Sequence, residues 1–170
     1  MREMERQRVT SLIVGGGAGY LLPDFYEAGD WRVATVMSVA SWNWDINYPG
    51  VLKVAEEYKE KYGRFIFEHA GEAYAIQWVI KEALEQAASR DPRKVRDAIA
   101  SLRLEPPHPA AIMPGGVVEF DEKGWNSHVY PVLIQWQGDG AMMPRTVYPL
   151  KEARRKPIYP VPSWSERKPK

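Results

Sequence analysis

Ser11-Leu-Ile-Val14 runs directly into Gly15-Gly-Gly-Ala-Gly19, so a short apolar run ends in a cluster of glycines. This pattern predicts a buried strand that closes in a tight turn. A short helix is expected over residues 22–27, with Pro23 in its first turn. The β-branched, apolar residues 32–40 predict a second strand. Two strands joined by a helical crossover form a βαβ unit, which indicates a parallel sheet and an α/β fold.

Three helices are predicted in the middle of the chain, where apolar residues recur with the helical period. The first follows Pro49 and ends at Gly63, a residue typical of helix ends. The second covers residues 70–88 and carries a broad apolar face. The third opens at Asp91-Pro92, an N-cap followed by proline at the first helical position.

Twelve of the fourteen prolines lie from Pro92 onward, in the second half of the chain, and we expect strands and loops after Glu105. The predicted strands are residues 117–120, 129–137 and 142–148. Gly138-Asp-Gly140 between the last two indicates a hairpin. Residues 151–170 show no periodicity, and we expect an extended tail held by Tyr159 and Trp164.

The composition excludes several classes of protein. The chain has 170 residues, of which 45% are hydrophobic and 26% charged, with no cysteine. Disordered, collagen-like and disulfide-stapled chains are excluded, as are thiolate nucleophiles, iron–sulfur clusters and cysteine-based zinc sites. The net charge of +1 combines an acidic body with a basic tail over residues 151–170. That tail is too short and unpatterned to indicate nucleic-acid binding, so we interpret it as a solvated terminus.

The glycine run does not match a nucleotide-binding fingerprint. Counted from Gly15 or Gly17, the last glycine of a Gly-x-Gly-x-x-Gly pattern falls on Tyr20 or Leu22. No acidic residue ends the next strand, and no Gly-Lys-Ser/Thr follows the turn. Two interpretations stay open, a plain tight turn and a turn whose bare backbone faces a ligand at the carboxyl end of a strand.

Few residues suggest catalysis or metal binding. His69 and Glu72 share one helix face near Glu68, but two ligands without a third do not make a metal site, and helix capping explains the carboxylates. The sequence has no Gly-x-Ser-x-Gly elbow and no local Ser/His/Asp set. We therefore predict neither a metal nor a cofactor, and no enzymatic activity.

The ordered motifs together resemble one family. They are IVGGGAGYLLPDFYEA (residues 13–28), VMSVASWN (36–43), YKEKYG (58–63), HAGEAYAIQWVIKEAL (69–84), DPRKVRDAI (91–99), VEFDEKG (118–124) and VLIQWQGDG (132–140). This series is similar to the carboxyl-terminal half of a type I periplasmic solute-binding protein of the leucine/isoleucine/valine-binding kind, the receptor subunit of an ABC importer. The resemblance covers residues 9–164 and lies in the order of many weak motifs.

The resemblance implies parts of two Rossmann-like, three-layer α/β/α lobes joined by hinge strands. Residues 9–40 and 129–150 would belong to the second lobe, and residues 48–122 to the first. The crossings would lie at residues 41–47 and 123–128, with Trp42 and Asn43 as hinge residues. The family's amino-terminal half would be missing, which leaves the helix at 70–88 and the strand at 32–40 without part of their cover.

The resemblance also implies a solute held in a cleft between the lobes. The residues that would face the cleft are Gly17, Ala18, Gly19, Tyr20, His69 and Glu72. Amino-acid binders of this family commonly carry an acidic residue where this chain has Gly17, and this departure widens the expected solutes to an amino acid, an amide or an aromatic acid. The implied partners are the ABC permease subunits and the missing half.

Three expectations concern the whole protein. The resemblance implies a periplasmic or extracellular, lipoprotein-like location for a full-length family member. This chain starts with a polar, charged segment at Met1 without a signal peptide, and by itself we expect it to be cytoplasmic. We expect a truncated fragment of a receptor. The alternatives are a stand-alone sensing or interaction module that pairs with a separate first half, and a small α/β enzyme.

Overall fold

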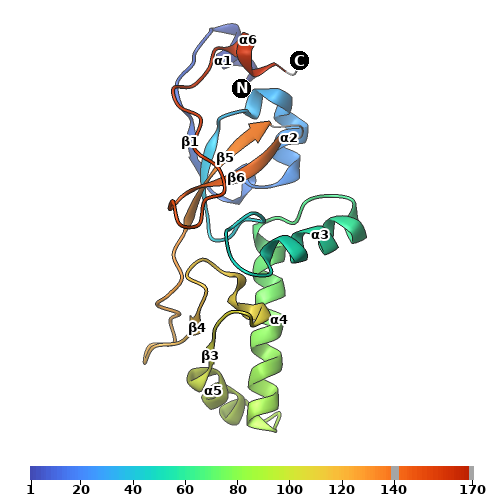
Figure 1. Cartoon of the computed structure of the whole chain (residues 1–170), viewed down its shortest axis with the longest axis vertical. Coiled ribbons are helices and arrows are strands. Elements are labelled where there is room, and N and C mark those ends of the chain that lie inside the picture. The colour runs from blue at the N-terminus through green and yellow to red at the C-terminus, as the bar shows by residue number, and fades with distance from the viewer. Residues whose placement is uncertain (139–141, 169–170) are drawn as a thin grey trace.

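The computed structural model describes residues 1–138 and 142–168. The molecule is elongated, with a four-stranded sheet toward one end and the long helix α4 running toward the other (Figure 1). In chain order the described elements are α1 (Arg2–Arg6), β1 (Val14–Gly16), η1 (Ala18–Tyr20), α2 (Pro23–Gly29), η2 (Asp30–Val33), β2 (Met37–Ala40), α3 (Val51–Tyr62), α4 (Glu68–Ala87), α5 (Pro92–Ser101), β3 (Arg103–Leu104), η3 (Pro109–Ile112), β4 (Val118–Glu119), β5 (Val132–Gly138), β6 (Met142–Tyr148) and α6 (Trp164–Arg167).

The main sheet has the strand order β1-β2-β5-β6. β1 and β2 are parallel and joined through α2, which confirms the predicted βαβ unit. β5 is antiparallel to both β2 and β6. The predicted pairing of the last two strands is therefore confirmed, while the turn over 138–140 lies largely outside the described residues. A second sheet pairs only β3 with β4. These observations confirm the predicted α/β class.

Four predicted strands, β1, β2, β4 and β5, begin later than expected. β4 begins at Val118 instead of residue 117, and β5 at Val132 instead of residue 129. Residues 32–36 were expected to be extended, but Asp30–Val33 is a 3-10 helix and β2 begins only at Met37. The cause is Thr35, whose φ of 72° is a left-handed conformation that a β-branched residue adopts only under tertiary constraint. The first strand, β1, begins at Val14 and includes Gly15 and Gly16, and Val14 is 59% exposed, so the prediction of a buried strand that ends before the glycines is wrong.

The three predicted helices are confirmed with small changes at their ends. α3 ends at Gly63, which has the left-handed φ of 71°. α4 begins at Glu68, two residues earlier than expected. The Asp91 side chain caps α5 by accepting bonds from the backbone N–H groups of Arg93 at 2.9 Å and Lys94 at 3.2 Å. The loop expected at 106–109 runs into a 3-10 helix, η3, that the sequence did not predict.

The predicted hinge residues Trp42 and Asn43 each hold a different part of the molecule. Trp42 is 1% exposed, and its indole N–H donates to the carbonyl of Ile112 at 2.9 Å. Asn43 donates from its amide to the hydroxyl of Thr146 on β6 at 3.0 Å. Trp42 and Asn43, which are adjacent in the chain, thus connect the segment around Ile112 to strand β6 of the main sheet. The largest hydrophobic cluster runs through this junction from β5 to α4, and the division into two lobes stays a prediction.

The carboxyl-terminal tail covers the face of the sheet opposite α2. Gln135 and Gln137 of β5 are buried there, and they bond to the backbone of Ile158 and Lys156. Trp164 is buried as expected, but Tyr159 is 75% exposed, so the prediction that Tyr159 holds the tail is wrong. The two glutamine side chains do this instead.

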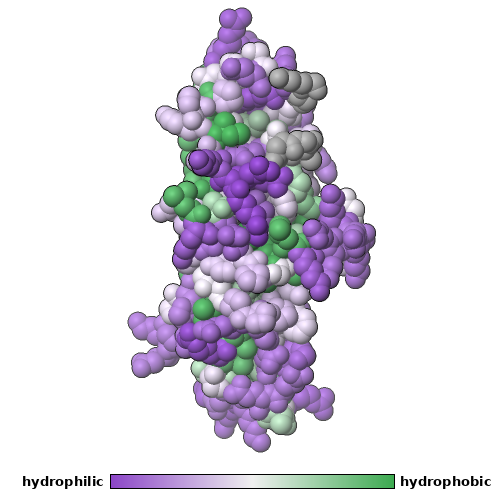
Figure 2. All heavy atoms as spheres, viewed as in Figure 1, coloured by the Kyte–Doolittle hydropathy of each residue, from purple (hydrophilic) through white to green (hydrophobic). Residues whose placement is uncertain are grey.

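The face of the molecule that Figure 2 shows is mainly polar. Hydrophilic side chains dominate both ends of the face in Figure 2, and hydrophobic side chains gather in small separate patches between them. Among the described residues, no helix combines the length and the apolar character needed to cross a bilayer.

Replacing Gly71 of α4 with Ala should destabilise the junction. A Cβ at this position would lie 2.3 Å from a ring carbon of Trp42, which is fully enclosed and cannot move aside. We expect the free energy of unfolding in urea to fall by about 1–3 kcal/mol, the usual cost of overpacking. Gly19→Ala is the control, because a Cβ there meets nothing within 4 Å. Equal effects of the two substitutions would contradict this account of the junction.

Candidate functional site

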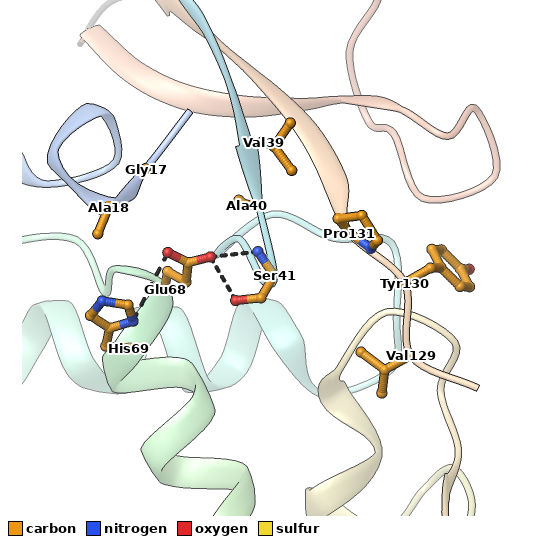
Figure 3. Close-up of a pocket in the computed structure, with 10 residues that line it drawn as sticks. All are labelled: Gly17, Ala18, Val39, Ala40, Ser41, Glu68, His69, Val129, Tyr130 and Pro131. Atoms are coloured by element: carbon orange, nitrogen blue, oxygen red, sulfur yellow. Dashed lines mark hydrogen bonds and ion pairs between the residues drawn. The ribbon is translucent and has the colours of Figure 1, made fainter. Parts of the chain in front are cut away.

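A cavity of about 480 Å³ lies between the end of the sheet and the start of α4 (Figure 3). It is lined by Gly17, Ala18, Val39, Ala40, Ser41, Glu68, His69, Val129, Tyr130 and Pro131. Its position follows from the strand directions. β1 and β2 are parallel, so their carboxyl ends meet at one edge, where open α/β sheets bind ligands. Gly17 and Ser41 are the first residues after these two strands.

Two carboxylates from α4 meet the hydroxyl of Ser41. Glu68 accepts a bond from that hydroxyl at 2.6 Å and another from the Ser41 backbone N–H. Glu72, one turn further along α4, approaches the same hydroxyl. A hydroxyl carries one proton and donates to only one carboxylate at a time. The second carboxylate therefore retains acceptor capacity beside the cavity.

His69 stands at the open side of this pair. Its Nδ1 lies 3.2 Å from a carboxylate oxygen of Glu72 and 3.9 Å from one of Glu68. The His69 side chain is 58% exposed, whereas that of Glu68 is 11% exposed. Within the described parts of the chain, no three His, Asp or Glu side chains are arranged to hold a metal ion. The group is thus an acidic, hydrogen-bonding wall.

The opposite wall comes from the segment that leads into β5. Val129, Tyr130 and Pro131 line the cavity there. In Figure 3 the ring of Tyr130 points away from Ser41 and Glu68, so this wall is formed by the chain of residues 129–131 and the ring is anchored behind it. None of the lining residues in the described structure is Lys or Arg.

The structure brings together part of the predicted site. Gly17, Ala18 and His69 line the cavity, whereas Glu72 lies outside its lining and approaches the hydroxyl of Ser41, which is part of it. Gly19 and Tyr20 lie outside its lining. The Tyr20 ring instead packs edge-on against Phe25, with ring centroids 5.2 Å apart. The ligand-binding role of these residues stays a prediction.

The sequence analysis missed Ser41, Glu68 and the wall over residues 129–131. The sequence does contain a pattern that points to Ser41. Ser41 directly follows β2 as Gly17 directly follows β1, and residues at the carboxyl ends of parallel strands lie at the same edge of the sheet. Glu68 was interpreted as a helix-capping carboxylate. No sequence pattern indicates that residues 129–131 line the cavity. They do so because β5 pairs antiparallel with β2, which places the start of β5 beside the end of β2.

An acidic residue at position 17 should destabilise the protein. Gly17 has φ 127° and ψ 158°, a backbone conformation essentially restricted to glycine. We expect Gly17→Glu to lower the free energy of unfolding by about 1–3 kcal/mol, measured by urea titration. Gly16→Ala serves as the control, because its Cβ would meet nothing within 4 Å. Full stability of the Gly17→Glu variant would show that the turn is not constrained.

Comparison with solved structures identifies the architecture, although no protein-family model matches the chain. A leucine-binding protein from Thermotoga maritima superimposes with a TM-score of 0.65 over 84% of this chain, at 24% identity. A type 1 periplasmic binding protein from Bordetella pertussis gives a TM-score of 0.60 over 86%, at 17% identity. An ABC-type branched-chain amino acid transporter from Rhodopseudomonas palustris gives a TM-score of 0.60 over 91%, at 16% identity.

The match covers much more of this chain than of the other proteins. The chain spans 39%, 42% and 38% of their respective lengths. What they share is the order and packing of helices and strands that the motif series predicted. The chain has the fold of a type I periplasmic binding protein, over somewhat less than half the length of the proteins with which it was compared.

Proposed function

We propose that this chain is part of the solute-binding component of an ABC transport system of the branched-chain amino acid or amide type. The observation that carries the proposal is the cavity at the carboxyl ends of β1 and β2, enclosed from the other side by the start of α4. Its lining offers the hydrogen-bonding side chains of Ser41, Glu68 and His69, which supports the binding of a polar solute. The names of the structural neighbours agree with this role.

The charge of the cavity favours a solute with an amine or amide group. Glu68 and Glu72 face Ser41, and neither Lys nor Arg is among the residues that line the cavity in the described structure. A carboxylate accepts strong bonds from ammonium and amide N–H groups, which an amino acid and an amide carry and a simple aromatic acid lacks. Of the solutes that the resemblance implies, an amino acid or an amide therefore fits better than an aromatic acid.

The function would rest on differential binding. A solute that contacts residues on both sides of the junction stabilises the arrangement in which both sides touch it. The permease subunits would recognise that arrangement. In this proposal the protein acts in the periplasm or outside the cell, together with the remaining part of the fold.

A second function is favoured by an uncovered helix face. Ile76, Ile80 and Leu84 of α4 are 54%, 42% and 40% exposed, and they recur at helical spacing. Contiguous exposed apolar side chains mark interaction surfaces. The alternative proposal is a sensing or interaction module in which this stripe binds a separately encoded polypeptide that supplies the rest of the fold.

Solute binding is tested by thermal unfolding followed through tryptophan fluorescence. L-leucine and acetamide should raise the midpoint, while benzoate should not, since a ligand of the native state at 100 times its Kd adds about 2.7 kcal/mol to stability. Glu68→Gln should reduce the shift. Glu85→Gln is the control on the same helix, because Glu85 pairs with Lys81 on the surface. A shift with benzoate alone would overturn the assignment of an amine- or amide-bearing solute.

The uncovered stripe predicts association. Ile76→Lys combined with Ile80→Lys should shift the sedimentation coefficient of the pure chain toward the monomer and abolish co-purification of a separately encoded partner. Gln77→Lys combined with Gln86→Lys adds the same charge at polar positions of α4. Identical sedimentation of both double variants would show that the stripe is not an interface.

A further inference from the structure

A buried carboxylate at the junction has no role in the proposed solute contacts. Glu152 follows β6 and is 1% exposed. Its Oε1 accepts a bond from the hydroxyl of Tyr48 at 2.8 Å and another from the hydroxyl of Tyr130. The ammonium of Lys151 lies 3.7 Å from the same oxygen. Burying an ionised carboxylate is costly unless it is well bonded, and two phenol donors meet that requirement.

The bonds around Glu152 join four separate segments of the chain. The Glu152 carbonyl accepts from the backbone N–H of Asn47 at 3.0 Å. The hydroxyl of Tyr48 accepts from the backbone N–H of Gly115 at 3.0 Å. Tyr48 and Tyr130 also contact each other, with 3.3 Å between their hydroxyl oxygens. The carboxylate is therefore the common acceptor of residues that follow each of the two predicted crossings.

The surroundings leave little freedom for this cluster. A Cβ at Gly116 would lie 2.6 Å from the ring of Tyr48. A Cβ at Gly115 would lie 2.1 Å from the carbonyl oxygen of His128, just before the wall segment 129–131. The backbone next to the cavity wall is thus packed against the same loop that bonds to Tyr48.

We infer that Glu152 is a positioning residue for the cavity, which holds Tyr130 from behind and thereby fixes the wall formed by residues 129–131. Through Tyr48 it also keeps the segments that follow both crossings in one arrangement. Its importance for solute binding rests on the proposed function. The positioning itself involves only residues of this chain and is measured without a solute.

Phenolate absorbance gives a signature of the cluster. Burial, and after it the bonds to Tyr130 and Glu152, raise the pKa of Tyr48, while burial and the bond to Glu152 raise the pKa of Tyr130. Tyr48 and Tyr130 should therefore ionise only at a pH above the ordinary pKa of a tyrosine. In Glu152→Gln these two should ionise at lower pH, because the negative charge is gone. Glu122→Gln, on the exposed turn, is the control. If the phenolate titration of Glu152→Gln equals that of the unchanged protein, the hydrogen bonds from Tyr48 and Tyr130 to Glu152 are contradicted.

Distances between spin labels test the positioning. The chain has no cysteine, so Glu27→Cys on α2 and Lys94→Cys on α5 introduce one labelled pair. We expect a single narrow distance distribution that broadens in Glu152→Leu and in Tyr48→Phe. Glu152→Gln keeps an acceptor oxygen and should restore much of the narrow distribution.

Gln135→Leu is the matched control for this experiment. It removes buried bonds to the tail within the sheet, so it lowers stability without touching the junction. Equal broadening in Gln135→Leu, or none in Glu152→Leu, would overturn the inference. If Glu152→Leu does not fold, Tyr130→Phe gives the same comparison with a smaller loss. Failure of every solute to shift the melting midpoint would count against the proposed function and leave these distances unaffected.

Discussion

The enclosed indole of Trp42 is the contact on which the arrangement of the molecule depends. It lies over Gly71 of α4 and donates to the carbonyl of Ile112, so it sets how the long helix meets the sheet. Ser41, one residue earlier, bonds to Glu68 at the start of the same helix. Asn43, one residue later, bonds to β6. Three consecutive residues thus connect the cavity, α4 and the edge strand β6. At position 71 only glycine leaves space for the indole ring of Trp42.

The junction is unusually polar for a place so well buried. Asp45 is 2% exposed, and its carboxylate accepts bonds from the backbone N–H and the hydroxyl of Thr146 at 3.0 and 2.7 Å. Burial raises the pKa of Asp45, and the bonds to Thr146 oppose that rise. Glu152 is enclosed in the same way by two phenols. Directional bonds of this kind specify one geometry, whereas an apolar core of equal size would tolerate repacking.

The turn after β1 carries no charged side chain, and the carboxylates near the cavity come from α4 instead. The backbone at Gly17 suits glycine alone, so the turn after β1 presents backbone to the cavity without a charged side chain. The negative charge comes instead from Glu68 and Glu72, across the cavity on α4.

Local pattern was enough to predict the βαβ unit, the three long helices, the final hairpin and the α/β class, because apolar periodicity, N-caps and glycine stops act within a few residues of the chain. It also placed Gly17, Ala18 and His69 near one another through the resemblance. It could not predict that Thr35 interrupts the second strand, that Tyr20 turns toward Phe25, or that residues 129–131 complete the cavity. The backbone N–H of Thr35 donates to the carbonyl of Trp136 on β5, and residues 129–131 reach the cavity through the antiparallel register of β5 with β2. Both are contacts between residues far apart in the chain, which local propensity does not encode.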